Sequence, residues 1–334
     1  MATYKEIHGT NIEVLSSDPS NPVNGQIWYN TTSNVVKGFL INAGSWSSAP
    51  NVATNRVYVG GCGSRTSALL FGGSDQATTT QSWNNTAWSS APALNTGRRT
   101  MGSAGTSNTS GLSVGGYTQA GPTTNLSNVE SYNGSWTNQT ALPSIRGKMG
   151  GAGTATLALM AGGEPTPNAQ IVQTYNGSWT TNPSLNSGRK QIYGWGTSSS
   201  CVMAGGRNND GPGSSNNTTE SYNGSSWTNG PTLIQAKYGA GMTQCGGDNN
   251  GSGYIAGGSN QALTPTNLNT TQKWNGSSWT SVGNLLNSLN GAGGGGSPSA
   301  GIIGGGTNDN SGSANQAAST TFVSGPTSVT IETS

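Results

Sequence analysis

The sequence predicts an all-β fold, because a hairpin motif recurs along the chain and short apolar runs end in paired glycines at a regular spacing. The motif is clearest at 129–137, VESYNGSWT, where Tyr132 precedes Asn133-Gly134 and Trp136 follows. Asn-Gly between β-forming residues signals a tight hairpin, and a type I′ turn needs positive φ at both central residues. Related copies are QTYNGSWT (173–180), ESYNGSSWT (220–228), QKWNGSSWT (272–280) and the looser QSWNNTAWS (81–89).

The paired glycines set the repeat length. They fall at Gly72-Gly73, Gly115-Gly116, Gly162-Gly163, Gly205-Gly206, Gly257-Gly258 and Gly305-Gly306, at intervals of 43, 47, 43, 52 and 48 residues. Apolar runs such as 68–71 and 157–160 come directly before them and are typical of buried strands. Self-similarity at about 40–50 residues with several short strands per unit indicates the blades of a β-propeller.

Each unit is expected to hold four antiparallel strands. In the second unit these are about 100–106, 111–116, 127–132 and 135–138. Six units predict a six-bladed propeller over residues 26–334, with blades at about 50–91, 92–142, 143–182, 183–230, 231–282 and 283–325.

The two chain ends are expected to share one blade. The last unit lacks the NGSW hairpin, whereas residues 26–48 contain a spare hairpin that ends in Trp46. N-terminal strands should therefore complete blade six and leave no exposed sheet edge. The sequence leaves open whether that blade is three strands plus one or two plus two. Residues 1–25, which include His8, are predicted to be an N-terminal docking arm.

Composition limits the functional classes. Only 7% of the 334 residues are charged, against roughly 25% in typical globular domains, but ten Trp and ten Tyr provide apolar anchors for an ordered chain. The formal charge of +2 and the absence of a long apolar stretch favour neither nucleic acid nor a membrane as partner. Three cysteines (Cys62, Cys201, Cys245) without CxxC spacing are expected to be free thiols, and the start of the chain does not resemble a secretory signal. We therefore expect assembly in a cytoplasm.

The repeat resembles the Kelch repeat, in which paired glycines end the second strand and an aromatic residue and a tryptophan follow. The resemblance runs from about Gly44 to Val323 in six copies. The spacing departs from the family, because Kelch repeats usually place about six residues between the aromatic and the tryptophan, whereas Tyr132 and Trp136 enclose three. The resemblance implies a structural role for the twelve paired glycines and for Trp46, Trp88, Trp136, Trp179, Trp227 and Trp279.

A second resemblance covers residues 19–38, PSNPVNGQIWYNTTSNVVKG. This segment is similar to one found in virion structural proteins of tailed phages, marine ones especially. The resemblance implies a non-enzymatic virion component, displayed on capsid or tail, that is held to other virion proteins by its N-terminal arm. Its task would be attachment to host-surface glycan or decoration of the particle, and its location the virion, assembled in the host cytoplasm.

Candidate catalytic residues are few. One histidine outside the repeat excludes a histidine-rich metal site or a catalytic triad within the blades, and we expect no metal and no cofactor. Two carboxylates could still hydrolyse a glycoside, so a carbohydrate-active hydrolase or lyase is the alternative function. Glu130 and Glu220 are the candidate pair, but they occupy a repeat position that elsewhere holds Gln81, Gln173 and Gln272. That equivalence favours a structural hydrogen-bonding role.

The basic residues recur with the blades. Six residues after a proline, the first strand of several units opens with Arg56, Arg98, Arg189 or Lys237, and Arg146 and Lys148 follow Pro143. The connections that carry them should share one propeller face with the loops at 117–126, 207–217, 259–268 and 307–317. This face is the expected ligand-binding surface for an anion or glycan, with candidate residues Arg56, Arg98, Arg99, Arg146, Lys148, Arg189, Lys190, Arg207, Lys237 and Tyr117. The alternative is that each arginine hydrogen-bonds backbone carbonyls inside its blade.

Overall fold

The computed structural model describes residues 12–23, 25–74, 77–118, 124–165, 168–208, 213–239, 245–248, 251–263, 266–308 and 316–331. The regular structure of these residues is almost entirely β-strand, joined by turns and loops, and includes a short 3-10 helix, η2 (Asn168–Gln170). The predicted all-β fold class is therefore confirmed. None of the helices in the described ranges is long and apolar enough to cross a membrane.

The chain divides into two compact units. One comprises Met1–Gly44 with Ser324–Ser334, and the other comprises Ser45–Val323. The sequence predicts a boundary between residues 25 and 26, whereas the structure assigns residues 26–44 to the smaller unit. Two long strands, β3 (Val35–Ala49) and β28 (Ser319–Ile331), run from one unit into the other.

The smaller unit is held together by strand pairing and by one carboxylate. Strand β1 (Glu13–Leu15) pairs in parallel with β2 (Ile27–Asn30), and β2 forms an antiparallel hairpin with β3. Asp18 accepts hydrogen bonds from Trp28 Nε1 (3.1 Å), Asn30 Nδ2 (2.7 Å) and Lys37 Nζ (2.8 Å). Part of the predicted 1–25 arm is thus a paired strand, while residues 1–11, which include His8, lie outside the described residues.

The larger unit contains five antiparallel sheets of four strands, each made from one continuous stretch of chain, among the described residues. In chain order they are β4 (Gly60–Ser64), β5 (Ser67–Phe71), β6 (Thr80–Trp83) and β7 (Trp88–Ala91); β8 (Gly102–Ser107), β9 (Ser110–Val114), β12 (Val129–Tyr132) and β13 (Trp136–Gln139); β14 (Gly150–Gly153), β15 (Ala158–Ala161), β16 (Val172–Tyr175) and β17 (Trp179–Asn182); β18 (Tyr193–Gly196), β19 (Cys201–Ala204), β20 (Thr219–Tyr222) and β21 (Trp227–Gly230); and β22 (Cys245–Asp248), β23 (Ser252–Ala256), β24 (Thr271–Trp274) and β25 (Trp279–Val282). A short hairpin of β10 (Tyr117–Thr118) and β11 (Thr124–Asn125) follows β9.

A further set of strands in this unit combines the two ends of the chain. Strands β26 (Gly293–Ser297), β27 (Ala300–Gly304) and the start of β28 come from the C-terminal part, and the end of β3 comes from the N-terminal part. The strand order β3-β28-β27-β26 gives three strands plus one. The Trp46 ring packs against Phe322, with centroids 5.0 Å apart, and Ser47 Oγ and Thr321 Oγ1 lie 3.0 Å apart. The combination is therefore packed as well as hydrogen-bonded.

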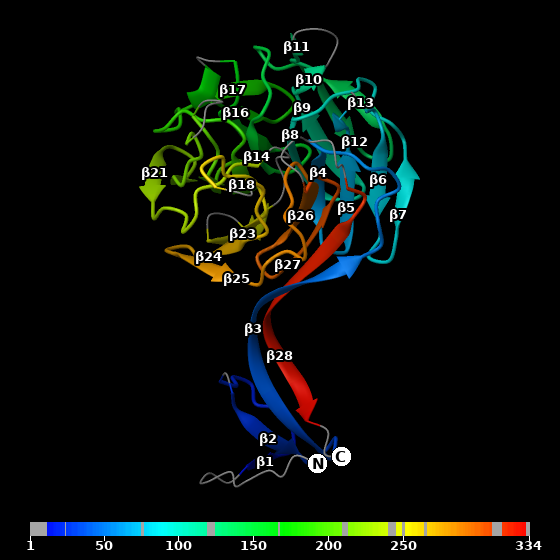
Figure 1. The fold of residues 1–334 in the computed structure, drawn as a ribbon, viewed down its shortest axis with the longest axis vertical. Coiled ribbons are helices and arrows are strands. Elements are labelled where there is room, and N and C mark those ends of the chain that lie inside the picture. Colours follow the sequence, from blue (N-terminus) through cyan, green and yellow to red (C-terminus); the bar gives the residue numbers. More distant parts are fainter. Residues whose placement is uncertain are drawn as a thin grey trace. The chain divides into compact units, whose positions relative to one another are not determined.

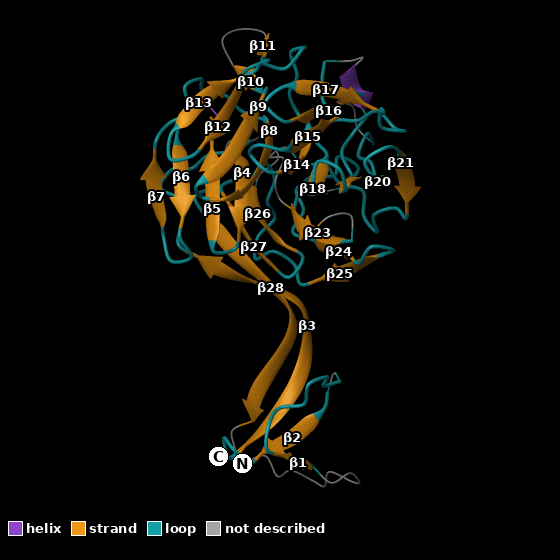
Figure 2. Cartoon of the chain, turned by 180° about the vertical axis from the view of Figure 1, so that it is seen from behind, coloured by secondary structure: helices purple, strands orange, loops and turns teal. Residues whose placement is uncertain are grey.

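The sheets of the larger unit lie around a common centre, a propeller-like arrangement (Figures 1 and 2). Strands β4, β8, β14 and β18 lie toward the middle, whereas β7, β17, β21 and β25 lie at the periphery (Figure 1). The first strands of consecutive sheets contact one another in the order β4, β8, β14, β18, β22, β26, and β26 also contacts β4.

The paired glycines join one sheet to the next. Both members of every pair have positive φ, for example 58° at Gly115 and 99° at Gly116. The second glycine donates a hydrogen bond to a carbonyl that opens the following unit, as Gly116 N does to Arg146 O (2.9 Å). A Cβ on Gly115 would collide with that same carbonyl oxygen, so both conformation and space require glycine. The six such bonds link Gly73 to Arg98, Gly116 to Arg146, Gly163 to Arg189, Gly206 to Lys237, Gly258 to Leu289 and Gly306 to Arg56.

The tryptophans of the outermost strands make a second set of links between sheets. Trp136 Nε1 donates to Thr80 Oγ1 of the preceding sheet (2.9 Å), and Trp279 Nε1 donates to Thr219 Oγ1 (3.0 Å). Trp46 Nε1 makes the same contact with Thr271 Oγ1 (2.9 Å). Trp88, Trp179 and Trp227 donate to Ser319 Oγ, Thr140 O and Pro183 O in the same direction around the unit. The indole ring of each tryptophan buries apolar area, and its N–H group donates a hydrogen bond to the preceding sheet.

The recurring hairpin departs from the expected turn. Tyr132 pairs with Trp136 across a three-residue loop, in which Gly134 has a φ of 111°. Asn133 is not among the residues with positive φ, so this is not a type I′ turn. In the longer copies the asparagine instead accepts hydrogen bonds from the loop, as Asn223 Oδ1 does from the N–H groups of Ser225 (3.0 Å) and Ser226 (2.9 Å).

Candidate functional site: a cavity lined by three cations and three tyrosines

Five of the basic residues expected on the binding face lie inside the sheets. Their side chains are at most 3% exposed, and each is enclosed between the second and third strands of its unit: Arg56, Arg98, Arg146, Arg189 and Lys237. Arg146 shows the pattern, because its Nη1 donates to Gly162 O (3.2 Å) and Ile171 O (3.0 Å) and its Nη2 donates to Gln173 Oε1 (2.8 Å). These five side chains, here called the interior cations, are not available to a ligand.

In four units the interior cation bonds the repeat position that holds Gln or Glu, whereas Gln272 bonds the backbone of Ile234 and Gln235. Arg56 bonds Gln81 Oε1 (2.9 Å), while Arg98 pairs with Glu130 and Arg189 with Glu220, with all four members of these ion pairs fully buried. Glu130 also accepts hydrogen bonds from the backbone N–H groups of Asn95 and Thr96. Both carboxylates are therefore occupied in separate sheets and do not form a pair in one site.

Burial shifts the titration of the interior cations. Loss of hydration lowers the pKa of Lys237 from 10.5 to about 7, and its Nζ donates to Thr270 O (2.8 Å) and Thr270 Oγ1 (2.9 Å). The pKa of Arg56 falls to about 10 for the same reason. Burial also lowers the pKa of Arg98 and of Arg189, and the paired glutamate opposes the shift in each case.

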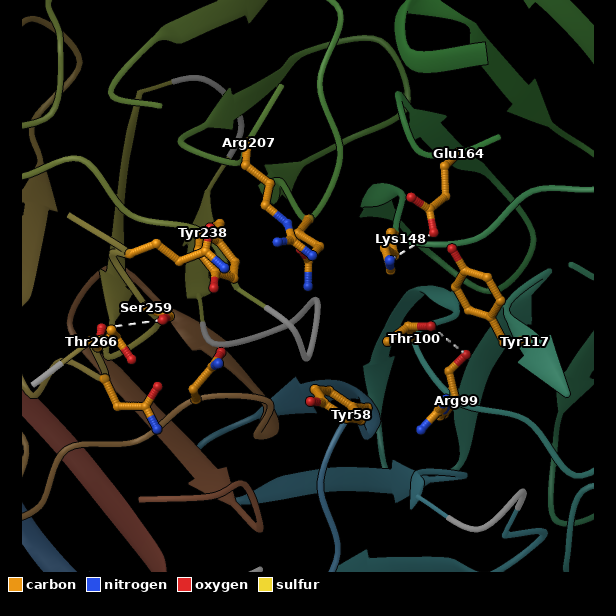
Figure 3. Close-up of a pocket in the computed structure, with 14 residues that line it drawn as sticks. Tyr58, Arg99, Thr100, Tyr117, Lys148, Glu164, Arg207, Tyr238, Ser259 and Thr266 are labelled. Carbon is orange, nitrogen blue, oxygen red and sulfur yellow. Dashed lines mark hydrogen bonds and ion pairs between the residues drawn. The ribbon is translucent and has the colours of Figure 1, made fainter. Parts of the chain in front are cut away.

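A cavity of about 580 Å³ opens where the first strands begin. Its lining comes from the connections that enter the first strands and from the loops that follow the paired glycines, all within Ser45–Val323 (Figure 3). The lining residues are Tyr58, Arg99, Thr100, Tyr117, Lys148, Glu164, Gln191, Arg207, Tyr238, Ser259, Gln261, Thr266, Asn267 and Asn290. Three of the four loops expected on one face, at 117–126, 207–217 and 259–268, contribute residues to this lining, whereas no described residue of 307–317 does. Parts of the loops at 117–126, 207–217, 259–268 and 307–317 lie outside the described residues.

The repeat places these side chains by backbone position. Tyr58, Thr100, Lys148 and Gln191 each stand two residues after an interior cation, and their backbones form a hydrogen-bonded series. Thr100 N donates to Tyr58 O (3.0 Å), Lys148 N to Thr100 O (2.8 Å) and Gln191 N to Lys148 O (2.7 Å). Gly239 N donates in turn to Gln191 O (3.1 Å), and Tyr58 N donates to Gly291 O (2.7 Å). This series is called the collar below.

Four residues of the collar have a left-handed backbone conformation, which is unfavourable for residues other than glycine. Tyr58, Thr100, Lys148 and Gln191 have φ values of 62°, 49°, 56° and 56°. In the described residues, the other non-glycine residues with positive φ are Asn34 and Asn85, and asparagine tolerates this region. Gly291 shows that glycine serves at the same collar position, with φ of 73°. The left-handed conformation costs roughly 1–2 kcal/mol for a residue with a Cβ. The four collar residues that line the cavity therefore carry backbone strain that glycine would avoid.

Three cations lie over tyrosine rings around the cavity. The Arg99 guanidinium is 5.6 Å from the Tyr58 centroid, Lys148 Nζ is 5.3 Å from that of Tyr117, and the Arg207 guanidinium is 4.7 Å from that of Tyr238. These contacts hold the positive charges in place at a partly desolvated surface.

One carboxylate counters this charge. Glu164 Oε1 accepts from Lys148 Nζ (2.7 Å), and Glu164 Oε2 accepts from Lys190 Nζ (2.5 Å). Among the described lining residues it is the single acid beside Arg99, Lys148 and Arg207. No group of three or more His, Cys, Asp or Glu side chains in the described ranges is placed to hold a metal ion.

Three buried oxygen atoms of the described lining have no hydrogen-bond partner. They are Tyr117 Oη, Gln191 Oε1 and Gln261 Oε1, and the side chains of Tyr117 and Gln191 are 4% and 3% exposed. A buried polar atom without a partner costs roughly 1–3 kcal/mol, and such groups commonly belong to sites that bind water or ligand.

The predicted face and the observed cavity share four residues: Arg99, Tyr117, Lys148 and Arg207. Lys190 is a near neighbour through Glu164. Sequence reasoning placed the loop that holds Ser259, Gln261, Thr266 and Asn267 on this face without singling them out, and it missed Tyr58, Thr100, Glu164, Gln191, Tyr238 and Asn290. A usable signal existed, because many of these residues come two positions after the interior cation or one position after the paired glycines.

The opposite ends of the first strands enclose a smaller cavity of about 240 Å³. Glycine backbones dominate its lining, and the described residues that line it carry no charge. Trp195 is the one large side chain in that described lining. The two cavities therefore differ in chemistry, and only the larger offers charged groups that could recognise a polar ligand.

Comparison with known proteins supports the fold. No protein family and no curated protein matches the sequence. Among solved structures, the chain is similar to "Structure of YjhT", with a TM-score of 0.62 and 12% sequence identity over 85% of this chain and 97% of that one. At this identity the likeness shows a propeller-like fold alone.

Proposed function

We propose that the chain is a six-bladed, Kelch-like β-propeller that serves as a non-enzymatic structural protein of a tailed-phage virion and attaches the particle to host-surface glycan. For the closed ring of six, the support is the cycle of backbone hydrogen bonds from each glycine pair to the next unit, ending with Gly306 N to Arg56 O (2.8 Å). Strand β3 would then supply the fourth strand of the sixth blade, next to β28.

The observation that carries the binding role is the larger cavity. It combines three cations, three tyrosines and several neutral amides and hydroxyls at one opening, and four of its side chains occupy left-handed positions. A volume of about 580 Å³ lies within the range of small-molecule sites, roughly 300–1,000 Å³. Such a mixture of hydroxyl, amide and cationic groups suits hydrogen bonding to sugar hydroxyls.

The virion role is supported by the resemblance of residues 19–38 to tailed-phage structural proteins. In the structure this segment supplies β2 and the first residues of β3 in the smaller unit. Val14 and Val23 of that unit are 65% and 67% exposed, and Ile12 and Ile27 are also exposed, in a chain that is only 31% hydrophobic. We propose that this unit binds another virion protein of the capsid, tail or fibre, because exposed apolar side chains gathered in a small unit are typical of a protein contact.

The test of the virion role is localisation on purified particles. An antibody against the larger unit, detected with gold in electron micrographs, should label one structural element of intact virions. Absence of the protein from purified virions would overturn the role. The alternative of decoration without attachment predicts labelling of virions, with no loss of adsorption when the antibody covers the propeller.

The enzymatic alternative, a hydrolase or lyase acting on surface glycans, needs two suitably placed carboxylates. Glu164 is the carboxylate that the described cavity lining offers, and it is bonded to Lys148 and Lys190. The discriminating measurement is product release from host polysaccharide, compared between the protein and its Glu164→Gln variant. Product formation that depends on Glu164 would replace the binding role with the enzymatic one.

A further inference from the structure

We propose that the larger cavity recognises an acidic saccharide, a sugar unit that carries a carboxylate or sulfate. Its negative group would lie near Arg99, Lys148 and Arg207, and its hydroxyls would bond the side of the cavity that presents hydroxyls and amides. This inference rests on the proposed glycan-binding function and names the class of glycan.

The charge of the cavity is the first argument. Three cations against one carboxylate leave an excess of positive charge, in a protein with so few charged residues. Tyr117, beneath Lys148, is 4% exposed and Arg207 is 9% exposed, so an anion bound there would be partly withdrawn from water and weakly screened. Guanidinium groups bind carboxylate and sulfate oxygens with two parallel hydrogen bonds, which neutral sugars cannot accept in the same way.

The unpartnered atoms are an independent argument. Tyr117 Oη and Gln191 Oε1 are buried in the lining without hydrogen-bond partners. The tyrosine hydroxyl is a donor or an acceptor, whereas the amide oxygen only accepts. A ligand that carries both acceptor oxygens and hydroxyl donors can satisfy both atoms, whereas a simple inorganic anion supplies no donor to Gln191.

The two sides of the cavity differ, and this difference points to a bifunctional ligand. Ser259 and Thr266 lie across the opening from Arg99 and Tyr117 (Figure 3). Asn267 joins them in the lining, so this side presents hydroxyls and amides, with Arg207 as the cation beside them, over the ring of Tyr238. Matched to such a cavity, the ligand has an anionic group at one end and hydroxyls at the other, as an acidic sugar does.

The experiment measures binding of soluble oligosaccharides by titration calorimetry. The probes are uronic-acid trisaccharides, their carboxyl-reduced neutral counterparts and sulfated forms of those neutral trisaccharides. The key variant is Arg99→Gln, because the Arg99 side chain is partly exposed and lies over the Tyr58 ring, while the backbone pairing of Arg99 with Tyr117 does not depend on the side chain. The matched control is Arg65→Gln, which makes the same change in the turn between β4 and β5, outside the cavity lining. A second variant, Lys148→Gln, repeats the test within the cavity.

The proposal predicts that at least one acidic trisaccharide binds at least about tenfold more tightly than its neutral counterpart, since a charge-assisted hydrogen bond is worth roughly 1.5–3 kcal/mol. Arg99→Gln should lower that affinity about tenfold or more, and Arg65→Gln should leave it unchanged. Whether the carboxylated or the sulfated member binds identifies the charged group.

Two results would overturn the proposal in different ways. Equal binding of acidic and neutral trisaccharides, or equal effects of Arg99→Gln and Arg65→Gln, would reject the acidic sugar while leaving glycan attachment in place. Binding of no trisaccharide by a protein with an intact thermal transition would reject the acidic sugar and glycan attachment together, leaving decoration of the particle.

Discussion

The interior cations and the cavity cations are neighbours in the sequence but have opposite roles. Arg98 and Arg99 are adjacent, yet Arg98 is fully buried and bonded to Glu130, whereas Arg99 lies over Tyr58 at the cavity. Arg146 and Lys148 differ in the same way. The basic residues that recur along the chain therefore form two groups with different roles, the interior cations and the cavity cations. The first of each pair joins strands within a sheet, and the second faces the cavity.

Removal of an interior cation should have the largest effect on the free energy of unfolding. Arg189→Met leaves Glu220 buried without its ion-pair partner, and we expect a loss of about 3–5 kcal/mol in the free energy of unfolding. Urea denaturation would measure the change. Arg56→Met is the matched control, because its partner Gln81 is neutral and its loss should be smaller, about 1–3 kcal/mol. Equal losses in the two variants would contradict this distinction.

Lys237 should make stability depend on pH. Its pKa is about 7 in the folded protein and near 10.5 in the unfolded chain, so between these values the unfolded state holds a proton that the folded state lacks. Stability should therefore rise with pH, by roughly 1–2 kcal/mol from pH 7 to 8.5. Above about pH 9 the buried thiols of Cys62 and Cys201, whose pKa values are raised by burial, act in the opposite direction.

The check on Lys237 is the Lys237→Met variant. Urea denaturation at several pH values between 7 and 8.5 should show a rise in the wild type and a flat profile in the variant. An unchanged slope in the variant would mean that Lys237 remains protonated in the folded protein.

A cavity cation should matter little for folding. Arg99→Gln removes one contact with the Tyr58 ring, which is worth about 0.5–1 kcal/mol at a partly exposed site. The thermal midpoint should therefore stay close to that of the wild type, in contrast with Arg98→Gln, where Glu130 loses its ion-pair partner. Similar losses for the two adjacent arginines would remove the basis for separating them.

The smallest effect on stability is expected for a glycine substitution at the collar. Thr100→Gly removes the strain of a β-branched residue in the left-handed conformation, which stabilises the folded protein by roughly 1–2 kcal/mol. It also increases the conformational freedom of the unfolded chain, which destabilises the folded protein by about 0.5–1 kcal/mol. Stability should thus stay within about 1 kcal/mol of the wild type, although Thr100 is only 4% exposed. Thr80→Gly, in extended strand β6, should be more harmful because it also removes the acceptor for Trp136 Nε1. A loss at Thr100 as large as at Thr80 would show that the collar is not strained.

Much of the fold could be predicted from the sequence, because the paired glycines and the tryptophans are required by backbone conformation and space. Gly115 has no alternative at its φ and beside the Arg146 carbonyl, so the residue type reports the structure directly. The pairing of β3 with β28 could be expected from a missing copy, but the boundary at Gly44 could not. That boundary depends on Asp18 and the β2–β3 hairpin, which the repeat does not include.

The site was predictable only in part, because residue type does not report burial. The Arg–Glu pairing within a sheet joins positions about 30 residues apart, and either member alone resembles a surface charge. The collar is harder still, since Tyr58, Thr100, Lys148 and Gln191 share a backbone conformation and no side-chain chemistry. Tyr117 and Tyr238 become recognisable as site residues only once Lys148 and Arg207 are seen above their rings.

The most direct test of the separation between interior and cavity cations is a crystal structure of the protein with the trisaccharide that binds it most tightly. The account predicts ligand density in the larger cavity, with an anionic group bonded to Arg99, Lys148 or Arg207 and a hydroxyl bonded to Gln191 Oε1, while Arg98 and Glu130 keep their ion pair. Ligand bound instead at the glycine-lined cavity, or on the unit formed by Met1–Gly44 and Ser324–Ser334, would contradict it.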